Sequence, residues 1–118
     1  MGLTIGVARE SAQGERRVAV TPETCRKLVA AGASVRIERG SGAGSHFPDP
    51  AYADAGAEVV DTAASALGDA DLVLCVQSPA ADAIATLRPG AVLVGILQPQ
   101  ADPAREAALS ARGIVAFP

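Results

Sequence analysis

The chain has 118 residues and a formal net charge of −3; 49% of its residues are hydrophobic but only 3% are aromatic. This length suits one domain with an aliphatic core, and the balance of charge excludes a disordered chain and a basic nucleic-acid-binding domain. The longest apolar run, 91–97, is too short to span a bilayer, and no basic segment precedes the first apolar run as in a signal peptide. We therefore expect a cytoplasmic protein that does not insert into the membrane.

Short apolar runs alternate with alanine-rich helical segments along the whole chain. A strand is predicted at 3–8 and a polar loop at 9–20. Thr21, Pro22 and Glu23 then mark a helix start, because a hydroxyl cap, a proline at the first helical position and an acid in the first turn are typical of one. This helix ends at Gly32. The later elements are a strand at 34–38, a glycine-rich loop at 40–44, a helix at 50–55, a strand at 57–60, a helix at 62–67, a strand at 71–76, a helix at 80–87, a strand at 91–97, a helix from Pro103 to about Arg112, and a strand at 113–117.

This alternation predicts a three-layer α/β fold with a mostly parallel sheet of about six strands, flavodoxin-like or Rossmann-like. The run at 71–76 is continuously apolar, as expected of a strand buried on both faces. Ligands of such sheets bind beyond the carboxyl ends of the strands, so the loops at 9–20, 40–48, 77–80 and 98–102 are the candidate binding segments.

Few side chains suggest catalysis. The glycine-rich loop at 40–44 has the spacing G-x-G-x-G and precedes His-Phe-Pro-Asp-Pro, which cannot open a helix, so we interpret it as a structural turn with positive φ angles rather than a dinucleotide site. His46 is the only histidine, and we expect it in a surface loop. Cys25 and Cys75 have no metal or redox spacing and are expected to be small buried hydrophobes. We predict neither a metal site nor a stand-alone catalytic residue.

Arg17 is the first candidate binding residue. It follows the first strand and leads directly into the cap of a helix, where a guanidinium could bind a carboxylate or phosphate in a fork. Residues 9–39 carry seven basic and four acidic side chains, and residues 40–118 carry three basic and nine acidic ones. The basic first third could meet an anionic ligand or could simply be a solvated surface.

Several segments together resemble one family. They are, in chain order, IGVARE at 5–10, ERRVAVTP at 15–22, ERGSGAGS at 38–45, DAGAEVV at 54–60, ADLVLCVQSP at 70–79 and LRPGAVLV at 87–94. In this order and spacing the chain resembles the start of the family that joins alanine dehydrogenase to the alpha subunit of proton-translocating NAD(P) transhydrogenase.

The resemblance implies that residues 1–118 are the first segment of the family's N-terminal domain, and that a Rossmann domain for NAD belongs to the rest of the intact protein. It implies NAD and NADP as cofactors of the intact enzyme, partners that bind NADP and cross the membrane, a peripheral place at the inner membrane, and a homodimer. The fragment alone is expected to be inactive.

Two glutamines indicate which branch of the family is present. In alanine dehydrogenases of this family an arginine matching Arg17 pairs with the substrate carboxylate, a lysine at the place of Gln77 holds the substrate, and a histidine at the place of Gln98 transfers protons. A neutral amide binds ligands but does not titrate near pH 7. A transhydrogenase passes hydride directly between two nicotinamides and needs no proton carrier at the carbon. We therefore predict a transhydrogenase subunit in which Arg17 and Gln77 lie near the nicotinamide.

Two alternatives stay open at this point. One is an amino-acid dehydrogenase of the same family, acting on alanine or saccharopine. The other is a non-enzymatic α/β regulatory domain that is complete at 118 residues. The first predicts amino-acid-dependent NADH formation by the intact protein. The second predicts a stable monomer with no exposed apolar face, whereas a segment of a larger domain would expose one.

Overall fold

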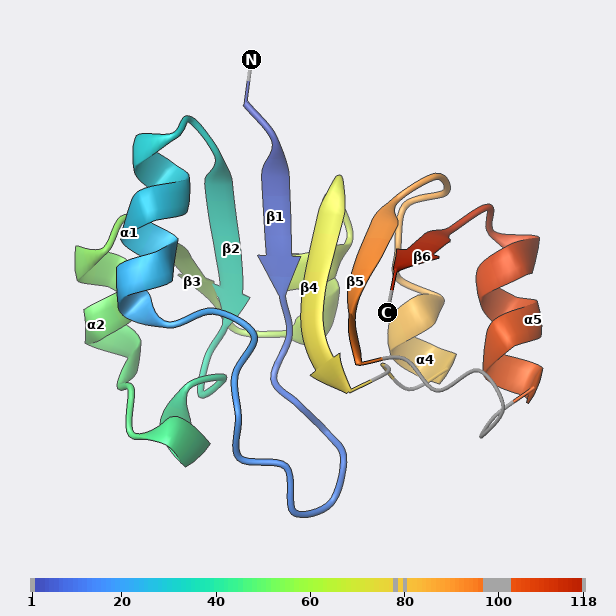
Figure 1. The fold of residues 1–118 in the computed structure, drawn as a ribbon, viewed down its shortest axis with the longest axis horizontal. Coiled ribbons are helices and arrows are strands. Elements are labelled where there is room, and N and C mark those ends of the chain that lie inside the picture. Colours follow the sequence, from blue (N-terminus) through green and yellow to red (C-terminus); the bar gives the residue numbers. More distant parts are fainter. Residues whose placement is uncertain (1, 78, 80, 97–102, 118) are drawn as a thin grey trace.

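The computed structural model describes residues 2–77, 79, 81–96 and 103–117. Six strands form one sheet in the order β3-β2-β1-β4-β5-β6, and every pair of neighbours is parallel (Figure 1). The strands are β1 (Thr4–Val7), β2 (Ser34–Glu38), β3 (Glu58–Val60), β4 (Leu72–Gln77), β5 (Val92–Ile96) and β6 (Val115–Phe117). The alternation predicted from sequence is confirmed. The order is that of the Rossmann fold rather than flavodoxin, and it reverses direction between β1 and β4.

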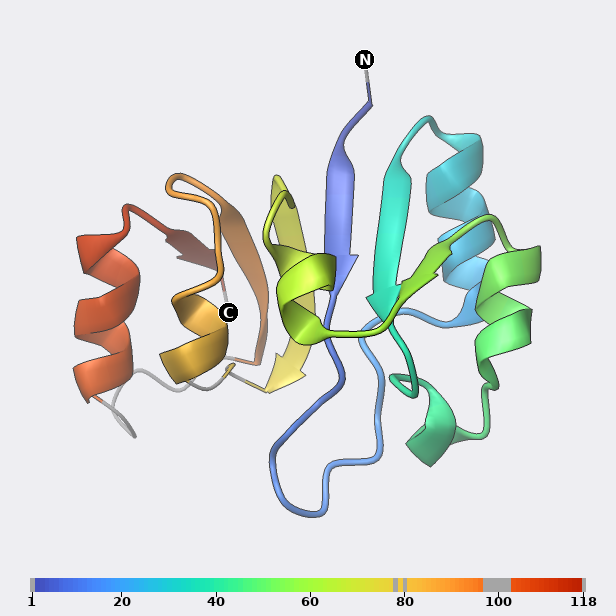
Figure 2. The ribbon, with the colours of Figure 1, turned by 180° about the vertical axis from the view of Figure 1, so that it is seen from behind.

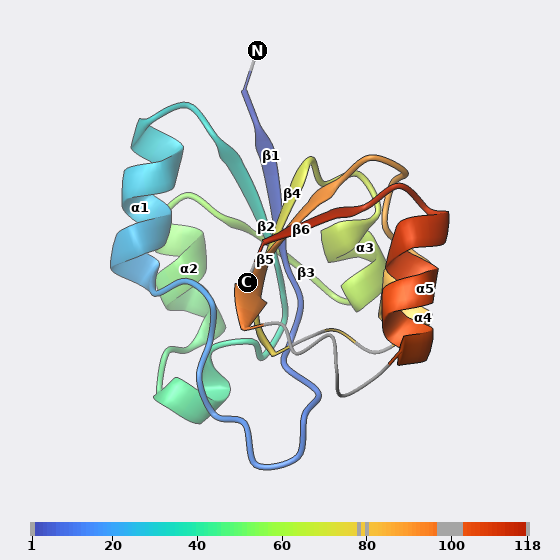
Figure 3. The ribbon, with the colours of Figure 1, turned by 45° about the vertical axis from the view of Figure 1, so that its right-hand side comes forward.

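The helices lie in two layers on opposite faces of the sheet, as Figures 2 and 3 show. Helices α1 (Pro22–Ala30) and α2 (Asp49–Asp54) lie on one face, and α3 (Ala63–Leu67), α4 (Ala81–Ile84) and α5 (Pro103–Ala111) lie on the other. Thr21 caps α1 by accepting a hydrogen bond from the backbone N–H of Thr24, as its sequence predicted. Thr62 caps α3 in the same way through Ser65.

Helix α4 is shorter than the predicted segment 80–87. After Ile84 the chain continues in turns, in which the backbone N–H of Thr86 binds the carbonyl of Ala83 and that of Leu87 binds Ile84. The Thr86 hydroxyl also donates to the Ala83 carbonyl. Pro89 has no N–H for a helical hydrogen bond and Gly90 has a positive φ of 84°, so the helix does not resume after these turns.

The core is divided by the sheet. Ile5, Val35, Ile37 and Tyr52 form the centre of the cluster on the α1 face, and Leu67, Val73, Leu87 and Leu93 form the centre of the cluster on the α3 face. Among the described residues, no helix covers β4, β5 and β6 on the α1 face (Figure 3). There Leu72 and Leu74 are half-buried and Val115 is 49% exposed, so an apolar strip of sheet remains open to solvent.

No helix of the described part of the chain combines the length and the hydropathy needed to cross a membrane.

Candidate functional site

The candidate site lies where the order of the strands reverses. Its main element is the long loop 9–20 between β1 and α1, which extends past the carboxyl ends of β1, β2 and β4 (Figure 1). In doubly wound sheets the crevice at this reversal is where ligands bind, because the chains on its two sides leave in opposite directions.

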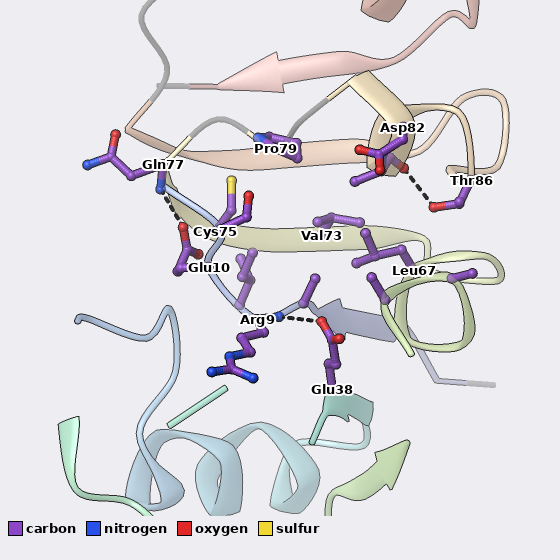
Figure 4. A pocket seen from close by; sticks show the side chains of 16 residues that line it. Arg9, Glu10, Glu38, Leu67, Val73, Cys75, Gln77, Pro79, Asp82 and Thr86 are labelled. Atoms are coloured by element: carbon purple, nitrogen blue, oxygen red, sulfur yellow. Dashed lines mark hydrogen bonds between the residues drawn. The ribbon is translucent and has the colours of Figure 1, made fainter. Parts of the chain in front are cut away.

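Glu10 joins this loop to β4. Its carboxylate accepts hydrogen bonds from the backbone N–H groups of Val76 at 2.9 Å and Gln77 at 3.0 Å, and Figure 4 shows the second contact. Strand β1 pairs with β4 only at Ile5–Leu72 and Gly6–Val73, so the later N–H groups of β4 have no neighbouring strand on that side. Glu10 supplies the acceptor that β1 no longer provides, and so fixes the end of β4.

Arg17 and Gln77, the two predicted binding residues, are brought together by a third side chain. Glu15 binds Arg17 Nε at 2.9 Å and Nη2 at 2.8 Å, and accepts from the Gln77 side-chain amide at 2.9 Å. It also accepts from the backbone N–H of Arg17 at 2.9 Å. The three side chains form one cluster although Gln77 is 62 residues from Glu15 in the sequence.

The electrostatics of this cluster follow from its hydrogen bonds. Donation by the Arg17 side chain, then by Gln77 and by the Arg17 backbone, holds the pKa of Glu15 well below its usual value of 4.5. Glu15 in turn raises the pKa of Arg17. The carboxylate is therefore ionised at neutral pH, its charge cancels that of Arg17, and Gln77 adds no charge.

The glycine-rich loop supports the segment that carries Arg17. The backbone of Arg16 lies against Gly44, where an added Cβ would come within 2.8 Å of the Arg16 carbonyl oxygen. The Ser45 hydroxyl donates to the same carbonyl at 2.7 Å. Only Gly40 has the positive φ that was predicted for the turn, at 81°, and Gly44 is required by this close approach instead. The loop is thus a structural support for residues 16 and 17.

Two cavities flank the end of β4. The larger, of about 710 Å³, lies on the α3 side, and Figure 4 shows Gln77 at one end of it and Asp82 and Thr86 at the other. The smaller, of about 490 Å³, lies on the α1 side, has Val76, Val94 and Phe47 in its lining, and is bordered by Arg17. The two predicted residues therefore line different cavities, and Glu15 links them.

The remaining candidates carry no chemistry here. His46 is exposed, as expected, and has a left-handed φ of 66°. Both cysteines are free thiols; Cys25 is fully buried and Cys75 partly buried. Burial, with a smaller contribution from the charge of Glu10, raises the pKa of Cys75 to about 12, so this thiol stays protonated. Gln98 lies outside the described residues. Within the described part of the chain, acidic, cysteine and histidine side chains nowhere gather as metal ligands.

Glu10 and Glu15 were not predicted as site residues from the sequence. The only local signal was the adjacency of Glu15 to Arg16 and Arg17, which a solvated charged loop would also show. Their decisive partners, Val76 and Gln77, are more than sixty residues away and meet them only through the fold.

Known proteins give an independent view of this arrangement. The sequence model of the family described as "Alanine dehydrogenase/PNT, N-terminal domain" matches residues 6–118. An NAD(P) transhydrogenase subunit alpha chain of Rhodospirillum rubrum is 41% identical over 97 residues, which are 78% of this chain and 25% of the relative. Alanine dehydrogenase of Bacillus subtilis is 36% identical over 115 residues, which are 98% of this chain and 30% of the relative.

Solved structures agree with the sequence comparisons. The crystal structure of transhydrogenase from Sinorhizobium meliloti superposes with a TM-score of 0.90 and 38% identity, over 97% of this chain and 34% of that one. The chain thus spans a quarter to a third of the length of these relatives.

Proposed function

The chain belongs to the alanine dehydrogenase/PNT N-terminal domain family, and we propose that it is the N-terminal portion of the NAD(H)-binding subunit of a proton-translocating NAD(P) transhydrogenase. In this proposal the intact protein passes hydride from NADH to NADP⁺, and Arg17 and Gln77 lie beside the nicotinamide. The relatives named above are enzymes, which argues against a non-enzymatic regulatory domain.

One observation carries this choice of branch: the side-chain amide of Gln77 completes the Glu15–Arg17 ion pair. The resemblance implies a lysine at this place in alanine dehydrogenases. With a lysine, two cations would face the one carboxylate of Glu15 and the cluster would carry an excess positive charge that suits an oxo-acid or amino-acid carboxylate. With Gln77 the cluster is neutral, which favours a neutral ligand group such as a carboxamide.

The dinucleotide as a whole does not fit the described residues. The first strand is followed by Ala8, Arg9 and Glu10 rather than by a glycine-rich turn, and α1 begins only at Pro22, so its N-terminus is not adjacent to the end of β1. We propose that another region of the intact protein holds the pyrophosphate and adenosine. The nicotinamide supplies the hydride when it is bound, and this chain binds and orients its carboxamide end and excludes water there.

The place of this chain in the intact protein, and the partners of that protein, are also proposals. We infer that residues 1–118 form the first segment of a longer domain, because the chain spans only a fraction of its relatives and the α1 face of β4–β6 is apolar and open. We further propose NADP as the second cofactor, partner components that bind NADP and cross the membrane, a homodimer, and a cytoplasmic place at the membrane surface. These follow from the likeness to a transhydrogenase alpha subunit.

An amino-acid dehydrogenase is the second candidate. It is favoured by the match to the alanine dehydrogenase of Bacillus subtilis over nearly the whole chain and by Arg17, whose side chain is 60% exposed and still has unused donors for a carboxylate.

Assays of the intact protein decide between the two. We expect NADH-dependent reduction of an NADP analogue and no alanine-dependent formation of NADH. A steady alanine-dependent signal would overturn the transhydrogenase proposal.

In the same protein, Gln77→Lys is expected to tighten pyruvate binding about tenfold, because a charge-assisted hydrogen bond replaces a neutral one. Gln13→Lys, which adds the same charge at an exposed loop position, serves as the matched control and should leave pyruvate binding unchanged.

A further inference from the structure

The two side chains of the Glu15–Arg17 ion pair differ strongly in their exposure to solvent. Its side chain is only 7% exposed, whereas that of its partner Arg17 is 60% exposed. In a solvated surface pair both ends are open to water and the pair contributes little. Here the side chain of the acid is covered by its partners Arg17 and Gln77, whereas the guanidinium is open to solvent.

The hydrogen-bonding capacity of Glu15 is fully used. One oxygen accepts from Arg17 Nη2 and from Gln77 Nε2, and the other accepts from Arg17 Nε and from the Arg17 backbone N–H. A carboxylate offers about four acceptor positions, so none remains for a ligand. Glu15 is therefore unsuited to act as a base or to bind the substrate itself.

Its two partners, by contrast, keep free groups. A guanidinium has about five N–H donors in a planar fork, and Glu15 takes one from Nε and one from Nη2, which leaves the outer edge formed by Nη1 and Nη2. Glu15 uses one amide N–H of Gln77 and leaves the other N–H and the side-chain carbonyl oxygen of Gln77 unused. These groups are polar, planar and fixed by the same carboxylate.

We propose that Glu15 is the positioning residue of this site: by binding the inner edge of Arg17 and the amide of Gln77 at once, it sets the relative geometry of the two groups that meet the ligand. This rests on the proposed function, in which Arg17 and Gln77 contact the nicotinamide end. The ligand group that matches these free donors and this acceptor is a neutral carboxamide at the end of β4, between the two cavities that Arg17 and Gln77 line. Its oxygen would accept from Arg17 and its N–H would donate to the Gln77 carbonyl oxygen.

The test compares Glu15→Gln with Glu23→Gln in the intact protein. Glu23 is a matched control, because its side chain is 77% exposed on α1 and, among the described residues, pairs only with Lys27, at 3.8 Å. The measurements are the hydride-transfer kcat, the Kd for NADH, and the ¹⁵N resonances of Arg17 Nε and Gln77 Nε2. For Glu15→Gln we expect kcat to fall about ten- to a hundredfold, Kd to stay within about twofold because the rest of the nucleotide is held elsewhere, and both resonances to shift. Glu23→Gln should change none of them.

Other outcomes are equally decisive. Unchanged resonances in Glu15→Gln would overturn the proposal, and so would shifted resonances with an unchanged kcat. If the wild-type intact protein transfers no hydride between nucleotides, the proposed function fails, and the resonances alone then decide whether Glu15 fixes its two partners. Should Glu15→Gln fold poorly, Arg17→Lys gives a second test: a lysine cannot bind the carboxylate side-on and still offer an outer edge, so a comparable loss of kcat is expected, and full activity would overturn the proposal.

Discussion

Tyr52 is one of the largest fully buried side chains and lies in the cluster on the α1 face. Its hydroxyl donates to the carbonyl of Val20 at 2.8 Å, and Val20 directly precedes the Thr21 cap of α1. This hydrogen bond ties α2 to the end of the loop that carries Arg17. A single buried hydroxyl therefore contributes both to the core and to the position of the candidate site.

Removal of the Tyr52 hydroxyl is expected to change the free energy of unfolding by an amount that depends on pH. Burial raises the pKa of Tyr52 to about 12 from the ordinary 10.0, so above pH 10 the unfolded chain loses a proton that the folded chain keeps. Stability of the wild type must then fall as pH rises. We expect Tyr52→Phe to be about 1 kcal/mol less stable at pH 8, and this gap to narrow above pH 10. Urea unfolding of both proteins at pH 8 and pH 11 measures it, and a gap that is constant across these values would contradict the assignment.

The sequence indicated the residues of the candidate site only in part. Arg17 could be selected because it follows the first strand and leads into a helix cap, whereas Gln77 was selected only through the resemblance to a known family. Glu15 could not, since its role depends on a contact with Gln77 across 62 residues and on the cover that Arg17 gives its side chain, neither of which a charged loop reveals locally. Long-range hydrogen bonds of this kind become visible only when the strand order is known.

The end of β4 depends on Glu10 as much as on its neighbouring strands. The pairing of β4 with β5 shifts register between Leu74 and Gln77, and on the other side β1 has already ended. The Glu10 carboxylate fills the gap by accepting two backbone N–H groups. A loop side chain thus supplies the hydrogen-bond acceptors that a neighbouring strand would otherwise provide.

We expect Glu10→Ala to lower the free energy of unfolding by about 1–3 kcal/mol, because the N–H groups of Val76 and Gln77 lose their acceptor in a half-buried place. Hydrogen exchange at these two amides should quicken while exchange in β2 stays the same. Glu23→Ala, on the exposed face of α1, should change stability by less than about 0.5 kcal/mol. Equal stability of the Glu10 variant and the wild type in urea would show that water replaces the carboxylate without cost.

The alternation of strands and helices along the chain predicts the fold class of the molecule, but not the order of its strands. Alternation predicts parallel strands, because each helix returns the chain to the end of the sheet at which the preceding strand began. It leaves open on which face each crossover passes, and so left the Rossmann and flavodoxin orders both available. In the structure the crossover between β3 and β4 moves to the opposite face, which places α3, α4 and α5 together. That choice creates the crevice between β1 and β4 and leaves β4–β6 open on the α1 face.

The open α1 face of β4–β6 makes the 118-residue chain a binder of apolar molecules. Leu72 and Leu74 are half-buried there and Val115 is 49% exposed, so the 118-residue chain should bind a hydrophobic fluorescent dye, since contiguous apolar surface of this kind marks a contact site. The intact protein should bind the dye much less, because further chain of the same domain would cover the strip. Val115→Lys should weaken dye binding to the 118-residue chain, while Ala53→Lys, on the exposed side of α2, should not. Equal dye fluorescence from the intact protein and the 118-residue chain would mean that the face stays open and that residues 1–118 are not the first segment of a larger domain.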